Sequence, residues 1–105
     1  MQDEIFGPVL PVLTYKNPQE IVDATESMGK PLALYIFSED EEFTDWIIAN
    51  TSSGGVTVNG VADHWWEPDL PFGGVNKSGI GRYHGIHGFK ELSHERSIFR
   101  KMPEA

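Results

Sequence analysis

Three short apolar runs are separated by segments in which apolar residues recur at helical spacing. Residues 8–15 form a β-prone run that contains two prolines, a composition typical of an edge strand or of a strand that begins at a bend. Residues 32–37 are apolar without a polar break, which is typical of a strand buried on both faces. Residues 56–58 form a third β-prone run. The pattern therefore predicts three strands.

A helix is predicted between the first two runs. Asn17 can cap its start, and Pro18 suits the first helical turn. Residues 21–28 then place apolar side chains on one face of a helix. Gly29 follows, and glycine commonly ends a helix because it adopts the left-handed conformation without steric cost.

A second helix is predicted between the second and third runs. Ser38 and Glu41 have the spacing of a capping box, and the acidic residues 39–42 favour the positive end of the helix dipole. The predicted order is β-α-β-α-β, in which the helices serve as crossovers between parallel strands. Residues 1–60 therefore predict a βαβαβ unit, a partial doubly wound α/β sheet.

The remaining residues, 61–105, predict a loop-rich tail. Six of the 11 glycines lie between positions 73 and 88, so an irregular glycine-rich segment is expected there. Residues 97–101 predict a short terminal strand. We interpret residues 1–105 as a single partial domain, because three strands and two helices leave much of a parallel sheet uncovered.

Composition narrows the classes of function. A net charge of −8 argues against nucleic-acid binding, which depends on neutralising phosphates. The absence of cysteine excludes disulfides, thiolate metal sites and a catalytic thiol on this chain. No apolar run approaches the roughly 20 residues of a membrane span. The acidic first residues do not resemble a signal peptide, so we expect a cytoplasmic protein.

Candidate chemical motifs are mostly excluded by their spacing. Residues 79–85 do not match a dinucleotide-binding fingerprint, and Lys77 lacks the adjacent glycine of a phosphate-binding loop. His84, His87 and His94 fit no zinc pattern, so no metal site is expected. The chain carries no catalytic set that is complete in itself.

Two adjacent tryptophans, Trp65 and Trp66, lie in the predicted loop that precedes the glycine-rich segment. Exposed aromatic side chains of this size often mark a binding surface. Two interpretations stay open at this point: the tryptophans form the wall of a ligand site, or they pack against another part of a larger fold.

Several blocks of the sequence resemble the aldehyde dehydrogenase family. Residues 4–9, Glu-Ile-Phe-Gly-Pro-Val, are similar to one signature of that family, and residues 70–81 are similar to its Pro-Phe-Gly-Gly…Ser-Gly-x-Gly segment. The resemblance extends over nearly the whole chain in the same order. Further blocks resemble the class 3 branch: residues 30–35, 52–57, 83–85 and 89–96.

The resemblance implies that this chain is the C-terminal part of a catalytic domain. Family members are several times longer, and their cofactor domain, glutamate base and cysteine nucleophile precede the block at residues 4–9. The expected partners are therefore the missing N-terminal portion of the parent enzyme and other copies in a homo-oligomer. The expected cofactor of the intact enzyme is NAD or NADP, with none bound by this chain alone, and the expected substrate is an aldehyde.

The resemblance also implies roles for individual residues. Glu4 is similar to the residue that accepts hydrogen bonds from the nicotinamide ribose, and Phe6 to the one that packs beside the nicotinamide ring. No residue of this chain is expected to be catalytic. The substrate funnel is expected to include Phe72, Trp65 and His64, with Gly7, Pro8, Asn59, Gly73 and Gly74 as structural residues near the site.

Two functions follow as hypotheses. In the first, the chain is part of an NAD(P)-dependent aldehyde dehydrogenase that oxidises aldehydes to carboxylic acids, and it is inactive alone because it lacks the nucleophilic cysteine. In the second, it is a stand-alone α/β module that binds or oligomerises without catalysis.

Overall fold

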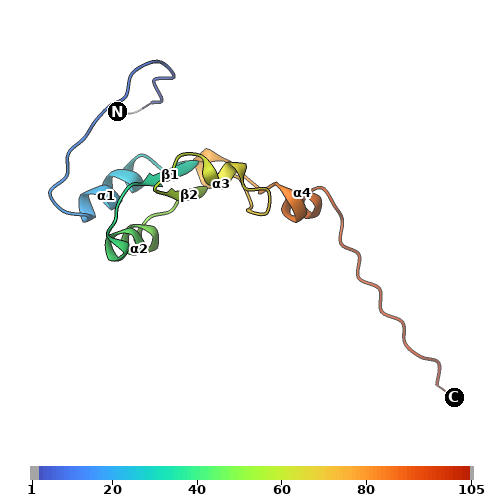
Figure 1. The fold of residues 1–105 in the computed structure, drawn as a ribbon. Helices are drawn as coiled ribbons and strands as arrows, with labels where there is room; N and C mark the ends of the chain where they lie inside the picture. Colours follow the sequence, from blue (N-terminus) through green and yellow to red (C-terminus); the bar gives the residue numbers. More distant parts are fainter. Residues whose placement is uncertain (1–2, 105) are drawn as a thin grey trace.

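The computed structural model describes residues 3–104 and confirms the α/β class (Figure 1). Two strands and several helices alternate along the first two-thirds of the chain, and short helices follow. The elements are α1 (Gln19–Ser27), β1 (Ala33–Ile36), α2 (Glu41–Asn50), β2 (Gly55–Val58), α3 (Asp63–Trp66), the 3₁₀ turn η1 (Asn76–Ser78) and α4 (Gly85–Glu91).

The sheet consists of β1 and β2, which pair in parallel through the crossover helix α2. Leu34 lies opposite Val56, and Tyr35 lies opposite Thr57. The two strands match the predicted runs at residues 32–37 and 56–58. The predicted β-α-β crossover is therefore confirmed for this part of the chain.

Helix α1 confirms the predicted element and its end, but its start differs from the prediction. The Asn17 side chain does not cap the helix: its amide donates to the Glu20 carboxylate at 2.7 Å. Glu20 also accepts from the backbone N–H of Lys16 at 3.3 Å. Gly29 ends the helix with a φ of +86°, the left-handed conformation that glycine adopts without steric cost.

Helix α2 is capped by Asp40, two residues after the predicted Ser38. The Asp40 carboxylate accepts from the backbone N–H of Phe43 at 3.1 Å. The Ser38 hydroxyl instead accepts from the backbone N–H of Asp40 at 3.0 Å. Ser38 therefore shapes the turn that leads into the helix, and Asp40 satisfies one of the helix's free N–H groups.

Two of the predicted strands are not strands in the part of the chain that the structure describes. Residues 8–15 and 97–101 form no strand and have no ladder partner among the described residues, and the side chains of Leu10 and Phe99 are 86% and 91% exposed. An apolar β-prone run becomes a strand only when a neighbouring strand supplies hydrogen bonds. The prolines in the first run further reduce its donors.

The predicted loop-rich tail holds more structure than expected. It contains α3, η1 and α4, and residues 72 and 83 form an antiparallel bridge. Phe72 and Tyr83 exchange two backbone hydrogen bonds of 2.9 Å. Helix α4 was not predicted because two of its seven residues are glycine, which disfavours helix.

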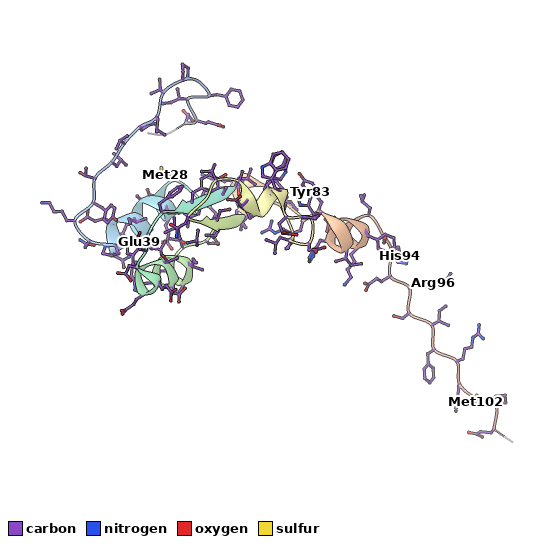
Figure 2. All side chains as sticks on the ribbon, viewed as in Figure 1. Met28, Glu39, Tyr83, His94, Arg96 and Met102 are labelled. Carbon is purple, nitrogen blue, oxygen red and sulfur yellow. The ribbon has the colours of Figure 1, made fainter. Side chains whose placement is uncertain are left out.

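The chain is elongated, with extents of 74 × 33 × 25 Å and a radius of gyration of 19.5 Å. A compact domain of this length has a radius of about 13 Å. Among the described residues only Val22, Ile36 and Ile47 are buried apolar side chains. Figure 2 shows Arg96 and Met102 on the extended segment beyond α4, away from this core. Most apolar side chains of the two end segments therefore face solvent.

Replacing Asp40 with alanine is expected to lower the free energy of unfolding by about 1 kcal/mol, because an N–H of α2 loses its cap. Urea denaturation measures the change. Asp45→Ala is the matched control, since Asp45 is an exposed acid within the same helix. Equal losses from the two variants would contradict the capping role.

Candidate functional site

Aromatic and histidine rings gather around Phe72, between the C-terminal part of the sheet and α4. The His64 ring stacks with Phe72 at a centroid distance of 5.8 Å and an angle of 30°, and the His84 ring does so at 5.8 Å and 20°. Tyr83 meets Phe72 edge-on at 5.6 Å, and Trp65 lies 6.4 Å away. We call these five residues the Phe72 cluster. It brings together Phe72, Trp65 and His64, the three predicted substrate-funnel residues.

His64 is the most buried member of the Phe72 cluster, at 8% exposure. Its ring Nδ1 lies 2.7 Å from the Thr57 hydroxyl, which also accepts from the backbone N–H of His64 at 3.2 Å. Thr57 lies on β2, so these two hydrogen bonds attach α3 to the sheet. The ring of Tyr35, on β1, lies 6.1 Å from the His64 ring.

Gly55, on β2, leaves the space that the His64 ring occupies. A Cβ atom at this position would lie 2.8 Å from His64 Nε2 and closer still to the ring carbon Cδ2. Any residue larger than glycine would therefore displace the imidazole. This glycine sets the distance between the sheet and α3.

Gly73 and Gly74 lie where backbone segments pack closely. A Cβ on Gly73 would clash with the carbonyl of Gly81, and a Cβ on Gly74 would clash with the backbone of Ser78. The Arg82 guanidinium donates to the carbonyl of Gly74 and, at 3.2 Å, to that of Gly81. This packing makes the glycine-rich segment a compact loop.

The loop borders a hollow of about 310 Å³, whose lining includes Phe72 and Tyr83. A second hollow of about 840 Å³ lies beside it, because Leu32 and Ser78 line both. Glu4 lines this second hollow. Of the two predicted cofactor residues, Glu4 is therefore the one on the wall of a hollow.

The other predicted residues of the N-terminal segment lie apart from these hollows. The Phe6 side chain is 91% exposed and lines neither of them, and its φ is +50°. The carbonyl of Gly7 accepts from the backbone N–H of Val9 at 2.8 Å, which forms a tight turn that includes Pro8. This turn is exposed to solvent.

Asn59 forms a structural link at the ends of the two strands. Its side-chain amide donates to the carbonyl of Ser38 at 2.9 Å and accepts from the N–H of Ser38 at 2.9 Å. Its backbone N–H donates to Ile36 at 2.7 Å. Asn59 therefore continues the pairing of β1 and β2 beyond their last residues.

Sequence reasoning missed three members of this site: Thr57, Tyr83 and His84. Thr57 could have been found from the sequence, because it is the polar residue within an apolar predicted strand and such a residue needs a hydrogen-bond partner when buried. His84 was weighed only as a metal ligand, and within residues 3–104 no three His, Cys, Asp or Glu side chains are placed to hold a metal ion. His64 Nε2 and His84 Nδ1 are buried without a hydrogen-bond partner among the described residues.

Aromatic rings and close-packed glycine backbone define the walls of the smaller hollow, and no cysteine occurs in the chain. The fold is a parallel β-α-β unit followed by a glycine-rich loop, which places the chain in the α/β class as part of a larger sheet domain.

Comparison with known proteins identifies the family. The aldehyde dehydrogenase family profile matches residues 1–98, and this chain belongs to that family. It is similar to the dimeric NADP-preferring aldehyde dehydrogenase of Rattus norvegicus, with 50% identity over 96% of this chain and 22% of the rat enzyme. The 4,4'-diaponeurosporen-aldehyde dehydrogenase of Staphylococcus aureus is 48% identical over 96% of this chain and 22% of that protein.

A solved structure of Staphylococcus aureus AldH in a substrate-bound state superposes on the whole chain with a TM-score of 0.91 and 46% identity, covering 23% of that protein. The chain thus spans about a fifth of the length of the curated relatives that it matches. Among the described residues, every helix is too short or too polar to cross a membrane.

Replacing Gly55 with alanine is expected to lower the free energy of unfolding by about 1–3 kcal/mol, because the new methyl group overlaps the His64 ring. Urea denaturation tests this. Gly88→Ala is the control: its Cβ would lie 3.6 Å from Tyr83 Cβ, an ordinary contact, and alanine favours helix α4. If Gly55→Ala were as stable as the control, the His64 ring would be able to move aside without a loss of folding free energy, and the packing role of Gly55 would be contradicted.

Proposed function

We propose that this chain works within a longer NAD(P)-dependent aldehyde dehydrogenase that converts an aldehyde, water and NAD(P)⁺ into a carboxylic acid, NAD(P)H and a proton. The observation that carries the proposal is the family match over residues 1–98. The length of the relatives supports the larger assembly, since this chain corresponds to about a fifth of each. The cofactor, when bound, accepts the hydride.

Glu4 and Phe6 are proposed to position the cofactor. A carboxylate can accept hydrogen bonds from two neighbouring ribose hydroxyls, and Glu4 lines a hollow large enough for part of a nucleotide. The exposed ring of Phe6 offers an apolar surface beside the nicotinamide. Gly7 and Pro8 form a tight turn directly after these residues, and we propose that it fixes the backbone that carries them.

Phe72, Trp65 and His64 are proposed to shape the aldehyde site. The ring centroids of His64 and Trp65 lie 5.8 and 6.4 Å from that of Phe72, and Phe72 borders the smaller hollow. Gly73 and Gly74 line this hollow, and Asn59, which links the ends of β1 and β2 through Ser38, is proposed as a further structural residue. Correct placement of the substrate lowers the barrier even when the reacting thiol lies elsewhere.

The nucleophile and base are proposed to come from outside these residues. A cysteine thiolate is the expected nucleophile, and this chain contains none. The chain alone is therefore proposed to be inactive, with the missing N-terminal portion of the enzyme as its partner. A cytoplasmic location stays a prediction from the sequence.

A second candidate function is binding without catalysis. The exposed apolar side chains of the C-terminal segment, among them Ile98, Phe99 and Met102, favour association with another chain. The rat relative is described as dimeric, which supports a homo-oligomer for the intact enzyme. This alternative would be favoured if this chain bound a partner protein and took part in no dehydrogenase activity.

Catalysis is tested with a chimera in which these 105 residues replace the matching segment of the rat relative. The chimera is expected to oxidise benzaldehyde with NADP⁺ or NAD⁺, measured as absorbance of the reduced cofactor. This chain alone is expected to give no turnover above a buffer blank, because it lacks the thiol. Activity of the chain alone, or an inactive but folded chimera, would contradict the proposal.

In the same chimera, Glu4→Gln is expected to raise the KM for NAD(P)⁺ about tenfold, because an amide accepts ribose hydrogen bonds less strongly than a carboxylate. Steady-state kinetics with varied cofactor measure the change. Glu26→Gln, at an exposed position on α1, is the control and should leave this KM unchanged. Equal KM values in the two variants would remove Glu4 from the cofactor site.

A further inference from the structure

We propose that Thr57 and His64 form a positioning pair that fixes the ring of Phe72 and thereby sets which aldehydes the enzyme accepts. The proposal rests on the proposed function, because it assigns a specificity role at the same site. Thr57 is 7% exposed and lines neither hollow beside the site, so it acts through His64 and Phe72.

The first step is the tautomer of His64. The Thr57 oxygen accepts from the backbone N–H of His64 at 3.2 Å, and its hydroxyl proton needs an acceptor. Nδ1 of the His64 ring, 2.7 Å away, is the one acceptor in the described structure within hydrogen-bond distance of that hydroxyl. The hydroxyl therefore donates to Nδ1, and the ring N–H is that of Nε2, which has no hydrogen-bond partner in the described structure.

The second step is the orientation of the ring. The Thr57 hydroxyl holds one edge of the imidazole, and the backbone of Gly55 lies close to the edge that carries Nε2. The ring of Tyr35 lies tilted at 46° against it. These contacts leave His64 one orientation in the packed structure, and that orientation stacks the imidazole with Phe72.

The third step connects this orientation to the substrate. Phe72 stacks with both His64 and His84 and also borders the hollow of about 310 Å³. If His64 turns, Phe72 loses one of its two stacked neighbours and is free to tilt into the hollow. A narrowed hollow excludes a bulky aldehyde more strongly than a small one. The pair therefore acts on selectivity between substrates, with little effect on the chemical step.

The test uses the active chimera with benzaldehyde and acetaldehyde as probes. Thr57→Val replaces the hydroxyl with a methyl group of similar size, so it removes both hydrogen bonds to His64 and preserves volume. It is expected to raise the KM for benzaldehyde about tenfold and the KM for acetaldehyde less than about twofold, with kcat for acetaldehyde unchanged. Thr57→Ser keeps the hydroxyl and is expected to retain the native ratio of the two KM values.

Thr44→Val is the matched control. Thr44 is also 7% exposed and its hydroxyl makes a part-buried hydrogen bond to the carbonyl of Asp40 at 2.9 Å, but it lies on α2. It should leave the ratio of KM values unchanged. If Thr57→Val does not fold, Thr57→Ala takes its place, since it also removes the hydroxyl, leaves the His64 side chain unchanged and should shift the ratio in the same direction.

The outcomes separate this proposal from the one on which it rests. If the chimera without further substitutions folds but oxidises neither aldehyde, the proposed function is overturned, and the positioning role with it. An active chimera in which the hydroxyl-free variant keeps the native ratio overturns the positioning role alone. The same shift in Thr44→Val and Thr57→Val, or no rescue by Thr57→Ser, also overturns it, because general loosening would then explain the change.

Discussion

The parallel pairing of β1 and β2 is the interaction on which the rest of the molecule depends. It places Thr57 opposite Tyr35, and His64 packs against both. Asn59 then extends the pairing to Ser38 through its side-chain amide. Four residues per strand give a small sheet, so its stability relies on the helix crossover and on these side-chain links.

The elements that the sequence predicted correctly are those that local pattern determines. The apolar run at 32–37 and the helix before Gly29 have this property, because burial and capping act within a few residues. The run at 8–15 has the same local character, yet a strand needs a hydrogen-bonding neighbour that no local pattern can supply. The start of α2 could not be predicted to the residue. Ser38 and Asp40 both carry a side-chain oxygen that can cap a helix, and the backbone geometry makes Asp40 the cap.

The site was predicted in part, for a similar reason. Resemblance drew attention to Phe72, Trp65 and His64, and the structure gathers them in one place. Tyr83 and His84 join them because a two-residue bridge folds the glycine-rich loop back on itself, a contact between positions 11 residues apart. The positive φ of His84, +85°, is part of that fold and is unusual for a residue other than glycine. Contacts of this kind arise from tertiary structure, beyond the reach of spacing rules.

Gly54 and Gly55 have a consequence for how the sheet assembles. A Cβ at 54 would strike the carbonyls of Leu32 and Gly73, and a Cβ at 55 would strike His64. A one-residue slip in one direction brings Ser53 to position 54, against the carbonyl of Leu32 beside β1. Gly54 therefore forbids that misalignment by excluded volume, in a sheet too short for its hydrogen bonds alone to determine the register. Gly55 acts on the next layer, since it sets how closely α3 packs on β2.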